Sequence, residues 1–504
     1  MINLDDALLG ELKNLLETAG TNGGAMSASV YDTAQALRLA PPKDGGRDVV
    51  AWLLAQQQPD GGWNDPELPL FRDGPTLAAI MALQGRSDVP RAREAVKEGE
   101  AFLRHDKGAW NEPWPKARPA GVEISLPALL DEARSLGLDV PSLEAYPAFG
   151  ERGPRMRAML PLLQKTLPAV AYFTWDSWGR DPARELIHPE AGIAINPANV
   201  ARWLSMTAAE PDLAAPRDAA HSFLARASAV TDERMTGVYP TSWPMPLFEI
   251  AFCLYALLIT DLLDHPALRD VVQRQLDKLA AAMKPEGLGC SPWFDVDGDD
   301  TAAAIAVLRA AGRPVDAAPL RGFQSRDHFC TWLHKVQPSA SVTGRAVHAL
   351  RLLGEDTRPM QGYLVRTQNE AGVWDGDPWN VSWAYVTYHA ITALEPLGPT
   401  PALEGAIRAL LDRQHPDGGY GLGPTSNPFE TLWGTLALLA CRSAGLLHDE
   451  LSRALGRAQA WMLDQDRAHR RDMPLRWIAK DLYAPRRIDR AFELATLLTL
   501  RKAL

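Results

Sequence analysis

The chain has 504 residues, a formal net charge of −10 at pH 7 and 46% hydrophobic residues, which is enough for two or three domains with large buried cores. The acidic balance disfavours a nucleic-acid-binding surface, because phosphate contacts need clustered basic residues. The four cysteines lie far apart and form no Cys-x-x-Cys pair, which argues against a disulfide or zinc framework and is typical of a reducing compartment.

The first segment predicts an amphipathic helix rather than a targeting sequence. It reads MINLDDALLGELKNLL, with two early acids and no apolar core, so it does not resemble a signal peptide. Its leucines at 8, 9, 12, 15 and 16 fall on one helix face. No run reaches the roughly 18 apolar residues that a membrane span needs. We therefore expect a cytoplasmic protein with no transmembrane segment.

Helical spacing of apolar residues continues along nearly the whole chain, and alternating strand patterns are scarce. Turns rich in glycine and aromatic residues recur between the helices, at QQQPDGGWND, RHDKGAWNEP, TQNEAGVWDGD and RQHPDGGYGLG. The first two turns lie about 46 residues apart, and so do the last two, which is the length of one helical hairpin per repeat. Stacked hairpins form an open solenoid or close into a ring. Two groups of repeats, near 50–112 and 360–425, favour two helical barrels.

These turns resemble the QW-type repeats of the triterpene cyclase and class II diterpene cyclase superfamily. Further segments in the same order carry the resemblance along most of the chain: SASVYDTAQAL at 27–37, AGVEISLPALLDEARSLGLDVPS at 120–142, GVYPTSWPMPLFEIAF at 237–252 and LRWIAKDLY at 475–483. The resemblance implies an all-α fold of two α-α barrels, called β and γ. Residues 1–24 would supply the first helix of the β domain, 25–228 the inserted γ domain, and 229–504 the rest of the β domain.

Four aspartates crowd the segment WFDVDGDDTA at 293–302, and three interpretations compete for them. Asp300 could cap a helix beginning near Thr301, which explains one or two of the acids. A calcium loop is disfavoured, because Asp300 stands where the loop needs glycine and Ala306 where it needs glutamate. The third interpretation is acid catalysis: carboxyls held close together cannot all ionise cheaply, so one of them keeps a proton.

The run Asp297-Gly-Asp299-Asp300-Thr-Ala is similar to the acid motif of class II diterpene cyclases, in which the middle aspartate protonates an alkene or epoxide. By that resemblance Asp299 is the general acid, and Asp297 and Asp300 orient it. Ser339 or Gln337 would stand in for the family's asparagine that hydrogen-bonds the acid. Because no Asp-Asp-x-x-Asp motif is present, we expect the diphosphate to be retained rather than ionised.

The carbocation formed by protonation needs stabilisation without a nucleophile, and aromatic faces provide it. The sequence has 16 tryptophans, and we expect Trp293, Trp332, Trp379 and Trp383 to line the pocket, although core packing explains each of them about as well. For the diphosphate, the resemblance points to Lys480 in the WIAK segment; Arg345 in SVTGRAV is a weaker choice, because the family does not clearly place a cation there. It implies that Glu123 acts near Mg²⁺ and the diphosphate.

The expected activity is cyclisation of a linear isoprenoid diphosphate, by family default geranylgeranyl diphosphate, to a bicyclic copalyl-, halimadienyl- or clerodienyl-type diphosphate. Plant enzymes that make the ent-copalyl product use a histidine and an asparagine for the final deprotonation, and local alignment puts Phe173 and Thr241 there. Since phenylalanine cannot accept a proton, the cation could persist and rearrange. We therefore predict a halimane or clerodane skeleton, against the unrearranged copalyl type. A class I terpene synthase is the expected recipient of the product.

Other functions stay open at this point. A drimenyl-type cyclase would use farnesyl diphosphate instead. Protein prenyltransferase β-subunits share an α-α barrel but need a zinc site, for which the scattered cysteines offer no obvious ligands. Squalene–hopene cyclases share the repeats and the acid motif, but they are longer and dock to membranes. A non-catalytic helical-repeat scaffold predicts that Asp299 is dispensable.

Overall fold

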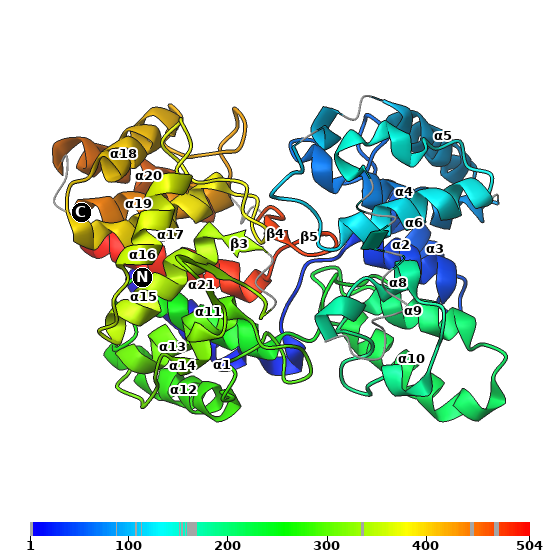
Figure 1. Cartoon of the computed structure of the whole chain (residues 1–504), viewed down its shortest axis with the longest axis horizontal. Helices are drawn as coiled ribbons and strands as arrows, with labels where there is room; N and C mark the ends of the chain where they lie inside the picture. Colours follow the sequence, from blue (N-terminus) through cyan, green and yellow to red (C-terminus); the bar gives the residue numbers. More distant parts are fainter. Residues whose placement is uncertain are drawn as a thin grey trace.

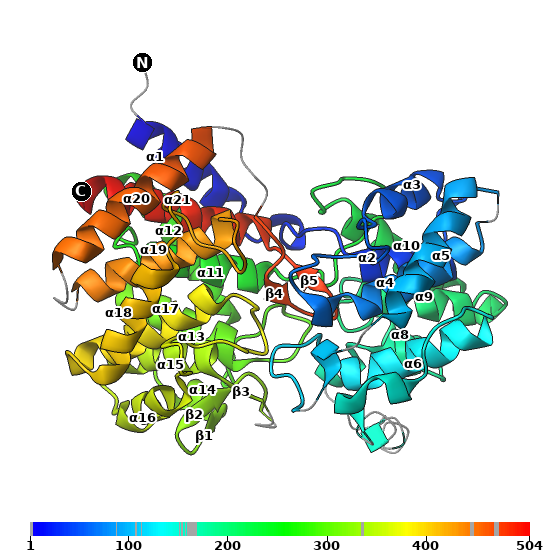
Figure 2. The same cartoon turned by 90° about the horizontal axis from the view of Figure 1, so that it is seen from above.

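Two lobes of helices lie side by side, and the short strands β4 and β5 lie between them (Figures 1 and 2). The computed structural model describes residues 4–503 apart from 87, 106–107, 112, 151, 153–154, 157, 159–168, 334–336, 444–447 and 468–472. The described elements are almost all helical, which confirms the predicted all-α class. Among the described helices, none is long and apolar enough to cross a membrane.

The larger lobe contains α1 and α11 to α21, so the two ends of the chain belong to the same lobe (Figure 1). Six of its helices contact one another in a closed ring, in the order α11, α13, α15, α17, α19 and α21. These inner helices span Pro246–Leu258, Gly298–Ala310, Ala340–Leu352, Trp383–Leu394, Pro428–Ser443 and Arg486–Ala503. Packed outside them are α1 (Leu4–Thr18), α12 (Arg269–Ala282), α14 (Ala318–Arg321), α16 (Arg358–Thr367), α18 (Pro401–Arg413) and α20 (His448–Arg467).

The smaller lobe is a second closed ring, made by α2, α4, α6, α8 and α9. Their bounds are Val30–Leu39, Asp73–Gln84, Val122–Ser135, Trp175–Trp178 and Pro197–Met206. The helices α3 (Arg47–Ala55), α5 (Pro90–Arg104) and α10 (Ala214–Ser228) pack on this ring. Each ring encloses apolar side chains, which is why helices such as α4 and α11 are buried along nearly their whole length.

The buried apolar side chains follow the two lobes. One large cluster joins Leu8, Leu12 and Leu16 of α1 to the helices after residue 245, and two further clusters lie within residues 30–243. Packing of the smaller lobe extends past residue 228, because Tyr239 and Trp243 belong to one of its clusters. The domain limits at 24/25 and 228/229 stay predictions.

Three of the four recurring turns are built in the same way. Gln57, Gln368 and Gln414 each use the side-chain amide to donate to the carbonyl of the glycine four residues on and to a carbonyl of a later helix. The backbone N–H of the aromatic residue then donates to a threonine hydroxyl on the next inner helix. A Cβ on Gly61, Gly372 or Gly418 would lie 2.4 to 2.7 Å from a carbonyl oxygen, so glycine is required. Trp110 differs, since its indole N–H donates to Asp73.

The strands are short and antiparallel. The first sheet has the order β1 (Gln324–Ser325), β2 (His328–Cys330) and β3 (Pro338–Ser339), with Gln324 opposite Phe329 and Phe329 opposite Ser339. The hairpin of β4 (Trp477–Ile478) and β5 (Leu482–Tyr483) joins the lobes. Ala120 of the smaller lobe donates its N–H to Ala479 in the hairpin, and Arg476 accepts from Val381 of the larger lobe.

Candidate active site

A cavity of about 530 Å³ lies between the two lobes, within the range of about 300–1,000 Å³ for small-molecule sites. The smaller lobe contributes lining residues within 118–124 and 170–174, with Met156 and Ile195. The larger lobe contributes the start of α13, the loop before α17 and the β4–β5 hairpin. The lining is largely apolar and aromatic. Its acidic members are Glu123, Asp297, Asp299 and Asp300.

The three clustered aspartates lie where α13 begins. Asp297 is the N-cap residue, and its Oδ1 accepts the backbone N–H groups of Asp299 at 2.9 Å and Asp300 at 2.8 Å. The cap is therefore Asp297, not Asp300 as expected, because the helix starts at Gly298. Asp300 is nearly fully buried and its Oδ1 has no hydrogen-bond partner. The fourth acid, Asp295, accepts the N–H of Val170 at 2.6 Å across the lobe boundary.

Burial keeps protons on this cluster. It raises the pKa of Asp297 to about 7, while the hydrogen bonds that Asp297 receives oppose the shift. Burial, together with the charges of Asp297 and Asp299, raises the pKa of Asp300 well above its ordinary value. Burial also raises the pKa of Asp299, against the opposing effect of Arg345. A carboxyl that faces an apolar cavity and holds a proton near neutral pH is the group that general acid catalysis requires.

Arg345 is part of this cluster and does not contact the cavity. It is fully buried on α15 and forms an ion pair with Asp299 through Nη1. Its Nη2 donates to Tyr385 Oη at 2.6 Å and lies 2.8 Å from His389 Nε2. The structure therefore does not bring Arg345, predicted as a weaker diphosphate contact, to the cavity wall: its charge is directed at the acid from inside the ring of helices.

Aromatic rings make two walls of the cavity. Phe173, Phe294, Trp332 and Trp379 follow one another edge to face, with centroids 5.9 to 6.3 Å apart. The cavity is also lined by Trp477, whose ring contacts the rings of Phe248 and Tyr483. Three of the predicted pocket residues, Phe173, Trp332 and Trp379, thus line the cavity.

The other three predicted pocket residues lie elsewhere. Trp293 is 39% exposed and packs on His188. Trp383 is buried inside the larger lobe, where its indole N–H donates to Gly421 and Arg413 lies over its ring. Thr241 is buried with its carbonyl bound by Asn196. Thr241 was chosen by local alignment and the tryptophans for their aromatic faces, and neither reason says in which direction a side chain points.

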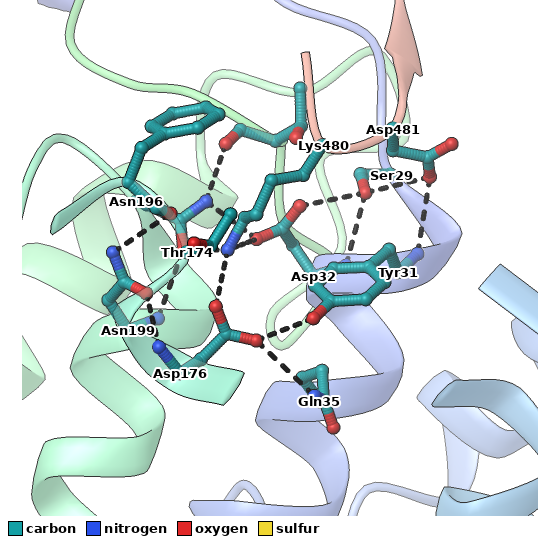
Figure 3. Close-up of polar contacts among 12 residues, drawn as sticks. Ser29, Tyr31, Asp32, Gln35, Thr174, Asp176, Asn196, Asn199, Lys480 and Asp481 are labelled. Carbon is teal, nitrogen blue, oxygen red and sulfur yellow. Dashed lines mark hydrogen bonds and ion pairs between the residues drawn. The ribbon is translucent and has the colours of Figure 1, made fainter. Parts of the chain in front are cut away.

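Lys480 lies in a separate buried network at the lobe boundary (Figure 3). Its Nζ donates to Asp176 at 2.8 Å and to Asn196 at 2.7 Å, and it lies 3.7 Å from Asp32. Ile478 and Ala479 line the cavity, whereas Lys480 does not. The ammonium therefore makes two hydrogen bonds and one longer ion-pair contact, all to residues of the smaller lobe, and in this structure it joins the lobes without lining the cavity.

The two residues predicted to position the acid have different surroundings. Ser339 caps α15 by accepting the Val342 N–H, and its hydroxyl donates to Asp377 at 2.7 Å instead of to the clustered aspartates. Gln337 lines the cavity. Ser339 is therefore removed from direct contact with the acid, and the cation of Arg345 takes the place expected for a neutral hydrogen-bond donor.

Glu123 and Arg118 meet at the smaller-lobe side of the cavity. Burial lowers the pKa of Arg118, and the charge of Glu123 opposes that shift. Among the described residues there is no group of three His, Cys, Asp or Glu side chains suited to a metal. One carboxylate in a cavity nevertheless fits the way Mg²⁺ binds, through one or two carboxylates plus substrate phosphates.

Sequence reasoning missed Arg118, Phe248, Phe294, Trp477 and Tyr483 as lining residues. The sequence offered a signal for two of them, because Trp477 and Tyr483 belong to the LRWIAKDLY segment that also contains Lys480. Phe294 directly precedes the aspartates. Arg118 carries no sequence signal of its own, because it reaches the cavity only through the fold of the loop before α6.

Comparisons with known proteins agree with this arrangement. No family model matches the chain. The chain is 39% identical to (+)-kolavenyl diphosphate synthase from Herpetosiphon aurantiacus, over 98% of this chain and 97% of that protein. It is 30% identical to ent-copalyl diphosphate synthase from a Streptomyces species, over 94% of this chain and 92% of that protein. The solved structure of ent-copalyl diphosphate synthase from Streptomyces platensis matches with a TM-score of 0.79 at 26% identity, covering 98% of this chain and 99% of that one.

The chain belongs to the class II diterpene cyclases. The comparisons thus confirm the family predicted from the repeats and the acid motif. They also confirm the predicted class of enzyme, a class II diterpene cyclase. The scaffold and prenyltransferase interpretations are set aside, because the similarity extends over nearly the full length of both proteins in each comparison.

Proposed function

We propose that this cyclase protonates the terminal alkene of geranylgeranyl diphosphate and closes a bicyclic product that retains its diphosphate. One observation carries the proposal: a cluster of buried carboxyls, with raised pKa values, borders an aromatic-lined cavity. In such surroundings the acid has few acceptors other than a bound alkene, which makes proton transfer to carbon productive. Asp299, at the middle position of the motif, is the proposed donor.

The aromatic walls suit the cations that follow protonation. Trp332, Trp379 and Trp477 line the same cavity as the aspartates, and the rings of Trp332 and Trp379 are in edge contact. A desolvated cation over an aromatic face is stabilised by on the order of 2 kcal/mol per ring. A series of rings can thus stabilise positive charge as it moves from one carbon to the next, without adding a nucleophile that would end the reaction early.

The diphosphate is proposed to lie at the Arg118 and Glu123 side of the cavity. Arg118 offers a planar cation for the phosphate oxygens. Mg²⁺ held by Glu123 and the diphosphate would offset the negative charge of the group. The expectation is tested by Glu123→Gln: KM should rise about tenfold, equivalent to about 1.4 kcal/mol, and the dependence of the rate on Mg²⁺ should weaken. An unchanged Mg²⁺ titration contradicts a metal role for Glu123.

Phe173 supports a rearranged product. Its ring lines the cavity and packs on Phe294, and it offers no proton acceptor. We propose that the first bicyclic cation therefore survives long enough for hydride and methyl shifts. One relative at 39% identity is named for kolavenyl rather than copalyl diphosphate. Phe173→His should divert product towards an unrearranged skeleton, which NMR of the dephosphorylated product distinguishes. An unrearranged product from the unmodified enzyme contradicts this part of the proposal.

The overall activity is tested by incubating the purified enzyme with Mg²⁺ and either geranylgeranyl or farnesyl diphosphate. Phosphatase treatment and mass spectrometry should show a bicyclic C20 alcohol from the first substrate. A faster reaction with farnesyl diphosphate would favour the drimenyl-type alternative. No cyclic product from either would contradict the proposal. Because the product keeps its diphosphate, a class I terpene synthase that ionises that group is the fitting next enzyme.

A further inference from the structure

The acid cluster has a counter-ion that the resemblance did not anticipate. Arg345 is fully buried, and its guanidinium forms an ion pair with Asp299. Asp299 also lines the cavity. The guanidinium lies over the rings of Phe252 at 4.6 Å, Tyr255 at 5.3 Å and Tyr385 at 5.8 Å. Aromatic faces and one phenol thus hold the cation from several sides.

The hydrogen bonds around Arg345 fix its direction. Arginine can only donate, so Tyr385 Oη and His389 Nε2 both accept from Nη2. Burial lowers the pKa of His389 well below its ordinary value, which fits a neutral ring that accepts at Nε2. Nη1 is the nitrogen that reaches Asp299. Among the described residues, the carboxylate that pairs with this cation is the middle aspartate of the motif.

We propose that Arg345 is a positioning residue that sets the acid strength of Asp299, by holding one carboxyl oxygen and stabilising the anion left after proton transfer. The inference deepens the proposed function and rests on it. In the initiating step the O–H bond of Asp299 breaks and a C–H bond forms at the terminal alkene carbon. The electron pair of the O–H bond stays on the carboxylate beside Arg345, and the positive charge passes to the tertiary carbon.

Two opposing requirements explain why a cation belongs here. Burial and neighbouring acids help the cluster to hold a proton, but the same effects weaken the acid. A buried positive charge against one oxygen restores acid strength, because it favours the charged form of the carboxyl. The conjugate base is thereby stabilised where water is excluded and where electrostatic effects are strongest.

Several other titratable groups surround the pair. Burial lowers the pKa of His348 to about 4 and raises that of Tyr255 to about 12. The pKa of Tyr385 is also raised by burial. Among the described residues, the titratable groups that interact with Asp299 or Arg345 are Tyr255 on α11, Asp297 and Asp300 at α13, His348 on α15, Tyr385, Tyr388 and His389 on α17, and Asp377.

The test is the pH dependence of kcat/KM with geranylgeranyl diphosphate for Arg345→Met, Arg345→Gln and Arg345→Lys. Loss of the charge in the Met and Gln variants should lower kcat by about 10- to 100-fold. Loss of the charge should also shift the alkaline limb of the profile, where kcat/KM declines, to a pH higher by about 1 unit or more. The reason is that the carboxyls then bind their proton more tightly. Arg345→Lys should keep the limb near its original place. A neutral variant whose limb stays unmoved overturns the proposal.

Matched controls separate this role from folding. Arg476 is another buried arginine, paired with Glu430 and Asp65 away from the cluster, so Arg476→Met should lose stability without moving the limb. If Arg345→Met fails to fold, Arg345→Gln retains hydrogen bonding and gives the same reading. If the unmodified enzyme forms no cyclic product, the proposed function fails. If the unmodified enzyme forms the cyclic product, and the neutral variants lose activity without a shift of the alkaline limb, only the role proposed for Arg345 is wrong.

Discussion

Two buried clusters of the molecule share a composition and differ in their function. Each combines several aspartates with one basic side chain: Arg345 in the larger lobe and Lys480 at the lobe boundary. Around Lys480 the acids are satisfied by other donors, including the hydroxyl of Tyr31 on Asp176 at 2.6 Å and the amide of Asn196 on Asp32 at 2.8 Å (Figure 3).

The acid cluster lacks that saturation. Asp300 Oδ1 has no partner, and Asp297, Asp299 and Asp300 all border the cavity. The hydrogen-bonded charges around Lys480 do not line the cavity, so they serve to join structural elements. A set with an unsatisfied carboxyl beside the cavity is placed to pass a proton to a bound ligand. Charge pattern alone does not separate the two, since hydrogen-bond completeness and access decide.

The largest expected effect is in catalysis. Asp299→Asn should reduce cyclisation at least about 10³-fold, because an amide cannot donate the initiating proton, while the melting temperature stays within a few degrees. Asp176→Asn, in the other cluster, is the matched control and should keep kcat within about threefold. Steady-state kinetics and thermal denaturation on both variants make the measurement. Comparable activity losses in the two variants would remove the distinction between the clusters.

The next effect is on stability at Lys480. Lys480→Met leaves Asp32 and Asp176 buried without their cation, so the free energy of unfolding should fall by about 3–5 kcal/mol. The exposed Lys97→Met is the control and should change it by less than about 0.5 kcal/mol. Urea denaturation gives both values. If instead KM for the substrate rises and stability holds, Lys480 contacts the diphosphate after all.

The third effect is the pH dependence that Asp32 contributes. Burial raises the pKa of Asp32 to about 6 in the folded protein, with Lys480 opposing. A group that binds its proton more tightly when folded adds stability at low pH, and that contribution is lost as the pH rises through about 6. The unfolding free energy of the unmodified protein minus that of Asp32→Asn should therefore fall by about 2 kcal/mol between pH 4 and pH 7. A flat difference contradicts the shift.

The smallest effects come from paired tyrosines. Tyr31→Phe removes a hydrogen bond to Asp176 and should cost about 2 kcal/mol of stability, with kcat unchanged. Tyr385→Phe removes an acceptor from Arg345 and should lower kcat about threefold, with a smaller loss of stability. Denaturation curves and initial rates for the two variants show whether Tyr31 acts mainly on stability and Tyr385 mainly on kcat. A rate loss in Tyr31→Phe with a stability loss in Tyr385→Phe would contradict the roles assigned here.

The sequence by itself determined the helical class, the repeated turns and the acid motif. Helical periodicity and the Gln–Gly–aromatic turns are local patterns, and the structure repeats the same turn at Gln57, Gln368 and Gln414 because the contacts involve nearby residues. The full-length resemblance likewise placed Asp297, Asp299 and Asp300 together, since they share one helix start.

Only the tertiary structure decided which cation belongs to which carboxyl. Arg345 comes from a different helix than Asp299, and Lys480 meets Asp32 and Asp176 from opposite ends of the chain. Thr241, Trp293 and Trp383 likewise looked as suitable as Phe173, Trp332 and Trp379 until their directions were known. Pairing of buried charges depends on distance and on exclusion of water, and neither quantity is encoded locally along a chain.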